Sequence, residues 1–297
     1  MCWLLKILFE SEFADSLVFQ GGTSLSKAFG AIDRFSEDTD LSLSPTFLRL
    51  PEAGTTRNQA DKWIKRAEAA CEVAVQSQIT PALETSVSNV LGNEQVRFEF
   101  LKDPNTNSLV LLFHYPSSQP TGFSYIKRSV KLEFGSLTDQ QPTGRHIITP
   151  WIAEVFPKAF SDWQCEVMAL EIERSFWEKA TILHAEYHRP LDKLMPDRFS
   201  RHYADTAMLA NHAEAIKAIN QHDLRNQVVL WKSQFFGSSW ANYDLAKPGT
   251  FRLVPKAERL PALRRDYRLM RDMYLTEPVS IDDILNTLSN LEHPINL

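Results

Sequence analysis

The chain has 297 residues, of which 43% are hydrophobic and 23% charged, and its formal net charge is −5. This length suits about two domains of ordinary size, and the composition predicts a normal buried core. Because the net charge is acidic, binding of nucleic acid through the field of the whole surface is excluded, and any such contact requires a local basic patch.

The cysteines, Cys2, Cys71 and Cys165, lie far apart and form no CxxC pair. This spacing argues against a zinc ribbon and a disulfide framework, and it fits a reducing, cytoplasmic setting. The apolar first segment is interrupted by Lys6 and lacks a small-residue cleavage site, so we expect an amphipathic helix there and no signal peptide. No run approaches 18 consecutive apolar residues, so no membrane span or membrane partner is expected.

The stretch DSLVFQGGTSLSKAFGAI, residues 15–32, predicts a strand, a glycine turn and a helix in succession. Gly21 and Gly22 form the turn, and Thr23 or Ser24 can cap the helix. Glycine lets the backbone approach a phosphate, N–H groups at a helix start face it, and the Ser24 hydroxyl could donate to it. The spacing is not that of a P-loop, and many strand-to-helix turns use glycine, so the turn alone is a weak indication of phosphate binding.

The next segment, DTDLSLS over residues 38–44, alternates in polarity and is typical of a strand. Residues two apart on a strand share a face, so the carboxylates of Asp38 and Asp40 are expected to lie close together. That pair would cost stability unless neutralised, whereas Mg²⁺ is typically held by one or two carboxylates and substrate phosphates. A solvated edge strand is the ordinary explanation. Here, however, the pair follows the glycine turn by 16 residues (38 − 22), which predicts a site for a metal-bound nucleoside triphosphate.

The rest of the chain divides into a sheet-containing half and a helical half. A helical segment and three strand candidates follow in the first half, at residues 57–79 for the helix and 94–101, 108–115 and 128–137 for the strands. A strong helix is expected from about Glu173 to His188, and the remaining sequence is helical in pattern. We therefore predict an α+β fold with a sheet domain over residues 1–150 and a helical domain over residues 151–297.

A third acidic residue lies on the last strand candidate. Val130, Leu132 and Phe134 form one face of that strand, while Lys131 and Glu133 lie on the other. If the apolar face covers a helix layer, Glu133 is on the polar side and could act as a third metal ligand or a general base. An ordinary amphipathic strand is the alternative.

Basic and histidine clusters carry weaker functional interpretations. The arginines recur as Arg198 and Arg201 beside His202, and as Arg264, Arg265, Arg268 and Arg271 near the C-terminus. A solvated helix face explains such runs more often than an RNA-binding patch. His184 and His188 have a spacing that could bind zinc, but the HExxH order is absent, so packing or capping roles are favoured.

Four segments together resemble the AbiEii/AbiGii family of nucleotidyltransferase toxins: FQGGTSLSKAFGAIDRFSEDTDLSLS, VKLEFGSL, RSFWEKATILHAEYHR and DRFSRHYADTAML. The resemblance runs from about Leu17 into the C-terminal helices. It implies a DNA polymerase β-like nucleotidyltransferase fold, a mixed sheet flanked by helices, followed by a helical C-terminal domain. It also implies membership of a type IV toxin–antitoxin system with a small antitoxin protein as partner. The implied reaction transfers a nucleotide from an NTP to an acceptor such as the tRNA 3′ end or another RNA, releasing pyrophosphate.

The resemblance also assigns residues to this reaction. The triphosphate positions are Gly21, Gly22, Thr23 and Ser24, with Lys27 on the same helix, and the Mg²⁺ or Mn²⁺ ligands are Asp38, Asp40 and Glu133. The later motif of the family matches Lys179 and Asp205, which would be contributed to the cleft by the helical domain. Lys179 could neutralise phosphate charge, or it could be a snorkelling surface lysine. Asp205 could hold Lys179 or a base, or pair with Arg201 one helical turn earlier.

Two other functions stay open from the sequence. A kinase-like phosphotransferase would use the same phosphate turn but release NDP in place of pyrophosphate. A non-catalytic nucleotide- or antitoxin-binding module would bind NTP without turnover, although its acidic positions are intact.

Overall fold

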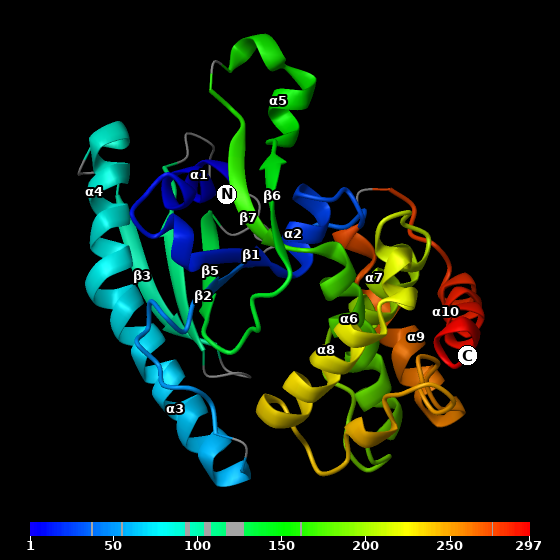
Figure 1. Ribbon diagram of the computed structural model, residues 1–297. Coiled ribbons are helices and arrows are strands. Elements are labelled where there is room, and N and C mark those ends of the chain that lie inside the picture. The colour runs from blue at the N-terminus through cyan, green and yellow to red at the C-terminus, as the bar shows by residue number, and fades with distance from the viewer. Residues whose placement is uncertain are drawn as a thin grey trace. The chain divides into compact units, whose positions relative to one another are not determined.

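A computed structural model describes the chain at residues 1–36, 38–54, 56–92, 96–103, 108–116, 128–160, 162–274 and 276–297. These residues form two compact units (Figure 1). Unit 1 comprises Met1–Ala28 and Ser36–Leu170, and unit 2 comprises Phe29–Phe35 and Glu171–Leu297. The division therefore differs from the predicted one at residue 150, because one further strand of the sheet, β7 (Cys165–Leu170), follows that position.

Unit 1 is built on a seven-stranded mixed sheet in the order β3-β4-β5-β2-β1-β7-β6. The strands are β1 (Leu17–Gln20), β2 (Asp38–Leu43), β3 (Arg97–Lys102), β4 (Leu109–His114), β5 (Ser129–Gly135), β6 (Thr143–Ile148) and β7 (Cys165–Leu170). The pairs β2–β5 and β1–β7 are parallel, and the other neighbouring pairs are antiparallel. This arrangement confirms the α+β class with a mixed sheet.

The helices of unit 1 are α1 (Cys2–Phe9), α2 (Gly21–Lys27), α3 (Arg57–Ala74), α4 (Thr80–Leu91) and α5 (Trp151–Val155). Figure 1 shows α3 and α4 as one long rod beside the sheet. A π-helical turn, Val75–Ile79, joins them where Pro81 cannot supply a backbone N–H. A capping box formed by Thr56 and Gln59 begins α3.

One face of the central strands forms the core of unit 1. Thr39, Leu41 and Leu43 of β2 are buried on this face. Cys71 of α3 is buried too, and its thiol lies 3.6 Å from the carbonyl oxygen of Phe134 in β5. Helix α3 therefore covers the apolar side of the sheet, and the polar residues of β2 and β5 are directed to the opposite side.

Unit 2 is helical, as the sequence predicted. Its helices are α6 (Ile172–His188), α7 (Ser200–Ala210), α8 (His222–Phe235), α9 (Leu260–Leu269) and α10 (Ile281–Ile295). Phe176, Trp177, Tyr203 and Phe251 are almost fully buried in its core. Segment 29–35, which lies between α2 and β2 in the chain, joins unit 2 through an antiparallel bridge from Arg34 to Tyr274. Among the described helices of both units, none is long and apolar enough to cross a membrane.

Candidate active site

Parallel pairing of β2 with β5 brings four charged residues onto one face of the sheet. Asp38 lies opposite Lys131, and Asp40 lies opposite Glu133. Paired residues of neighbouring strands share a face, as do residues two apart on one strand. The alternation read from the sequence is therefore correct for Asp38 and Asp40, and Glu133 lies beside them on the polar side.

The ammonium group of Lys131 lies among the acidic side chains of this face. Its Nζ is 3.0 Å from Asp38 Oδ1 and 4.0 Å from Asp103 Oδ2, and it also pairs with Glu133 Oε1. The sequence placed Lys131 beside Glu133, but it did not indicate the contact with Asp38 or with Asp103, which directly follows β3. We call Asp38, Asp40, Glu133, Asp103 and Lys131 the charged cluster.

Burial and the nearby charges shift the pKa values of two members of the charged cluster, Lys131 and Glu133. Burial alone would lower the pKa of Lys131, but the hydrogen bonds and charges of Glu133 and Asp38 outweigh it and raise that pKa to about 12. The pKa of Glu133 is raised, mainly by burial. The hydrogen bond from Lys131 opposes this shift, and the negative charge of Asp38 adds to it. Lys131 is thus held as a cation, and Glu133 accepts a proton more readily than an exposed glutamate does.

Gly21 brings the glycine turn into direct contact with Asp40. Its φ is +78°, and a Cβ placed on it would lie 2.7 Å from Asp40 Cγ and overlap the carboxylate. A side chain is therefore excluded twice at this position, by the backbone conformation and by the neighbouring carboxylate. The turn and the carboxylate pair, which the sequence predicted as one site, lie side by side in unit 1.

The hydroxyl groups of the turn are directed into the protein. Thr23 Oγ1 donates to the backbone oxygen of Asp38, and Ser24 Oγ donates to the backbone oxygen of Gly21 at 3.0 Å. Ser24 is fully buried, so the expected donation from its hydroxyl to a phosphate does not agree with this arrangement. Lys27 stacks over Trp151, with Nζ 3.6 Å from the ring centroid. Phosphate binding by this turn stays a prediction and depends on backbone groups.

The carboxylates of the charged cluster fit a hard divalent cation in their chemistry. Mg²⁺ takes oxygen ligands and is usually held by one or two carboxylates together with substrate phosphates. Within the described part of the chain, no three His, Cys, Asp or Glu side chains converge closely enough to hold a metal by themselves. Asp38 and Asp40 can therefore supply part of a ligand set that phosphate oxygens would complete.

Lys179 and Asp205, the residues assigned to the later motif by resemblance, form a buried ion-pair triad with Arg34 inside unit 2. Asp205, which is fully buried, accepts from Arg34 Nε at 2.7 Å and Arg34 Nη2 at 2.8 Å, and its Oδ2 lies 2.7 Å from Lys179 Nζ. Asp205 thus holds Lys179, one of the expected alternatives, but its second partner is Arg34 and not Arg201. Arg34 lies within the first segment of the family resemblance, but no role was assigned to it there, because its partner is 171 residues away in the chain.

The electrostatics of the triad favour an ionised Asp205. Burial would raise its pKa, but Lys179 and Arg34 outweigh burial and hold the pKa well below its usual range. Burial lowers the pKa of Lys179, and nearby Arg34 lowers it further, while Asp205 opposes both. In this arrangement Lys179 neutralises a carboxylate of its own unit, and its contact with a triphosphate stays a prediction.

His184, one of the two histidines considered for zinc, has a structural role. His184 Nδ1 accepts from the backbone N–H of Arg252 at 3.1 Å, and Nε2 lies 3.1 Å from the carbonyl oxygen of Asn242. Both ring nitrogens are engaged, and burial lowers the pKa of His184 to about 4. This agrees with packing and not with metal binding.

Two of the C-terminal arginines, Arg264 and Arg271, are engaged in ion pairs within unit 2. Arg264 forms a two-point contact with Asp282, with Nη1 2.9 Å from Oδ2, and Arg271 pairs with Glu277. These contacts support the solvated helix face over a patch reserved for RNA.

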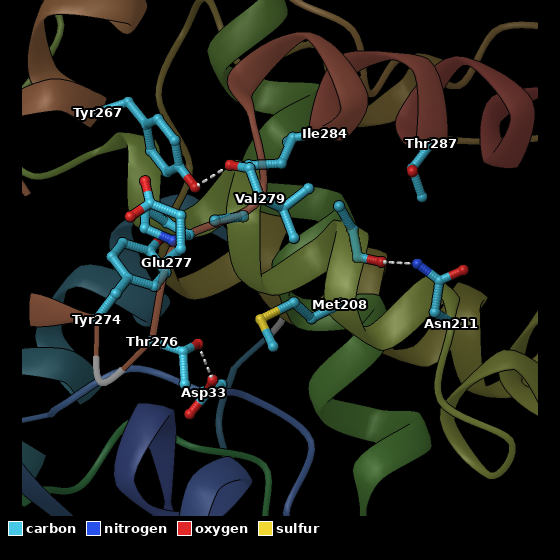
Figure 2. Close-up of a pocket in the computed structure, with 13 residues that line it drawn as sticks. Asp33, Met208, Asn211, Tyr267, Tyr274, Thr276, Glu277, Val279, Ile284 and Thr287 are labelled. Atoms are coloured by element: carbon cyan, nitrogen blue, oxygen red, sulfur yellow. Dashed lines mark hydrogen bonds between the residues drawn. The ribbon is translucent and has the colours of Figure 1, made fainter. Parts of the chain in front are cut away.

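A small cavity of about 100 Å³ lies in unit 2 (Figure 2). Tyr267 and Met208 are among the side chains that line it, and the Tyr267 hydroxyl donates to the backbone oxygen of Val279 at 2.7 Å. Thr276 Oγ1 donates to Asp33 Oδ2 at 2.6 Å beside it. This second contact attaches segment 29–35 to unit 2, and we assign the cavity no chemistry.

Comparison with known proteins shows the family of the chain and supports its fold. The family model described as "Nucleotidyl transferase AbiEii toxin, Type IV TA system" matches residues 3–287. Among solved structures, MenT4, a nucleotidyltransferase toxin from Mycobacterium tuberculosis, is similar with a TM-score of 0.51 and 15% sequence identity. The alignment covers 99% of this chain and 80% of MenT4, and this likeness bears on the fold. No curated protein sequence matches the chain significantly.

Proposed function

Because the chain belongs to the AbiEii family of type IV toxin–antitoxin nucleotidyltransferases, we propose that its charged cluster catalyses metal-dependent transfer of a nucleotide from an NTP to RNA. The acceptor we propose is the 3′ end of tRNA. The observation that carries the proposal is the position of Asp38 and Asp40 on one face of β2, with Glu133 opposite Asp40 on β5 and Gly21 against the Asp40 carboxylate.

Each group of the cluster has a role in this proposal. Asp38 and Asp40 would hold Mg²⁺ or Mn²⁺, which supplies positive charge to the phosphates when bound. The backbone of the turn at Gly21 and Gly22 would bind the triphosphate, since glycine permits close approach. Glu133, whose pKa is raised by burial, would accept the proton of the acceptor hydroxyl.

The step itself is an in-line displacement. The acceptor hydroxyl oxygen forms a bond to the α-phosphorus, the bond from that phosphorus to the β-phosphate oxygen breaks, and pyrophosphate leaves. The hydroxyl proton passes to Glu133. Lys179 and Asp205 belong to the proposal as positions of the family motif, and Thr23, Ser24 and Lys27 would support the turn.

Labelled nucleotides separate this reaction from a kinase-like transfer. The purified protein is incubated with total tRNA, a divalent cation and NTP labelled at either the α- or the γ-phosphate. We expect RNA to acquire α-label and no γ-label, with release of pyrophosphate. The Asp38→Ala, Asp40→Ala double variant should transfer no label. Transfer of γ-label would support a kinase-like enzyme, and equal transfer by the double variant would reject the proposed site.

A further inference from the structure

Lys131 differs from an ordinary surface lysine in the number and origin of its partners. It contacts Asp38 on β2 at 3.0 Å, Glu133 on its own strand, and Asp103 beyond β3 at 4.0 Å. These acids come from three parts of the sheet, so the ammonium is the point at which they meet. The side chain of Lys131 is only 29% exposed, which also distinguishes it from a lysine extended into solvent.

The sheet register fixes this position. Lys131 lies directly opposite Asp38, as Glu133 lies opposite Asp40, so Lys131 cannot leave the acidic face without a change of strand pairing. Its stem is flexible, however, and the ammonium can move while the backbone stays in place.

We propose that Lys131 is an internal counter-ion, which pairs with Asp38, Glu133 and Asp103 in the metal-free protein and competes with a divalent cation for Asp38. The proposal rests on the proposed function in taking Asp38 and Asp40 as metal ligands. Its physical basis is that neighbouring carboxylates repel one another unless a cation lies between them. An ammonium and a divalent cation both meet that need, and the two cannot occupy the same position.

Two consequences follow for the protein. Without a metal, the cluster stays compatible with the folded sheet, because Lys131 offsets part of its negative charge. A metal alone then binds weakly, because it must displace Lys131 from its partners. The triphosphate of an NTP offers the displaced ammonium a new anionic partner, so metal and NTP are expected to bind more tightly together than separately.

Titration with Mn²⁺, followed by the electron paramagnetic resonance of the free ion, tests the competition without any enzymatic turnover. Lys131→Met is expected to bind Mn²⁺ on the order of tenfold more tightly than the wild type, a difference of about 1.4 kcal/mol. Its melting temperature should be lower than that of the wild type without metal and should rise more when Mn²⁺ is added. Lys131→Arg keeps the positive charge and should behave like the wild type in both measurements.

Lys102→Met provides the matched control. Lys102 lies on β3 next to Asp103, but its ammonium pairs with Glu72 at 2.5 Å, away from the charged cluster, so its loss should leave Mn²⁺ affinity unchanged. If Lys131→Met also leaves affinity and melting temperature unchanged, the counter-ion role is rejected while the metal site stands. If Mn²⁺ binds none of these proteins, or binds Asp38→Asn as tightly as the wild type, the proposed metal site fails and the counter-ion role fails with it. If Lys131→Met folds only in the presence of Mn²⁺, the counter-ion role is supported.

Discussion

At the scale of single residues, the contact between Gly21 and Asp40 links the glycine turn to the carboxylate pair. The sequence showed both features but not that they touch, because the distance depends on how β1 pairs with β2. In the structure Gln20, which precedes the turn, lies opposite Asp40. Glycine is therefore required at position 21 because the Asp40 carboxylate leaves no space for a side chain.

Gly21→Ala tests that contact. An alanine held at the positive φ of position 21 should cost about 1 kcal/mol of stability. The methyl group of this alanine should also displace the Asp40 carboxylate and strongly reduce nucleotidyl transfer. Gly249→Ala is the control, because Gly249 has a φ of +84° and open space around a Cβ. We expect the control to lose stability in urea unfolding but to keep its activity. Equal activity in the two variants would contradict the role of the Gly21–Asp40 contact.

At the scale of elements, the Arg34–Asp205–Lys179 triad attaches segment 29–35 to α6 and α7 within unit 2. The backbone supports this attachment, since the Phe35 N–H donates to the Met273 carbonyl at 2.6 Å. Lys179 and Asp205 stand out in the sequence as a motif, but Arg34 is 171 residues from Asp205, and no periodicity connects them. Such a partner is visible only once the chain has folded.

Asp205→Asn measures how strongly the triad contributes to stability. Removing one partner of a buried ion pair costs about 3–5 kcal/mol, so the variant should unfold at much lower urea concentration. Asp282→Asn, which breaks an exposed pair with Arg264, should have a far smaller effect. A variant that loses transfer activity without losing stability would instead show that Asp205 acts in the reaction alone.

The pH dependence of the unfolding free energy of Asp205→Asn gives a second measure of the contribution of the triad to stability. The folded-state pKa of Asp205 is depressed, so its stabilisation is present above the unfolded-state value of about 4 and is lost as the pH falls toward the folded-state value. The difference in unfolding free energy between the wild type and Asp205→Asn should therefore narrow progressively below about pH 4. A constant difference down to acid pH would contradict an ionised Asp205 in the folded protein.

At the scale of the whole molecule, local patterns predicted most of the architecture. Alternation identified β2 to β5, and helical spacing identified α6 and the helical second half. Strands β6 and β7 were missed, although Cys165, Val167 and Ala169 alternate in burial along β7, because that stretch is short and adjoins a strong helix signal. The omission of β7, which lies beyond residue 150, placed the division at residue 150, whereas unit 1 extends to Leu170.

The candidate site was predictable to the extent that it depends on neighbours in the sequence. Asp38 and Asp40 share a face because they are two residues apart on a strand. Glu133 and Lys131 required an assumption about which face of β5 is buried, which the structure supports. The pairing of Lys131 with Asp38 required the register between strands that lie 93 residues apart (131 − 38), and this register is set by the tertiary fold.

The central claim is that the carboxylates of β2 carry the chemistry, and pyrophosphate release by Asp40→Asn measures it most directly. Thr39→Val is the control on the same strand, because Thr39 faces the core and its buried hydroxyl makes no hydrogen bond. With NTP, tRNA and Mg²⁺, we predict that Asp40→Asn releases pyrophosphate about 100- to 1,000-fold more slowly than the wild type, while Thr39→Val keeps the wild-type rate. A wild-type rate in Asp40→Asn would contradict the account.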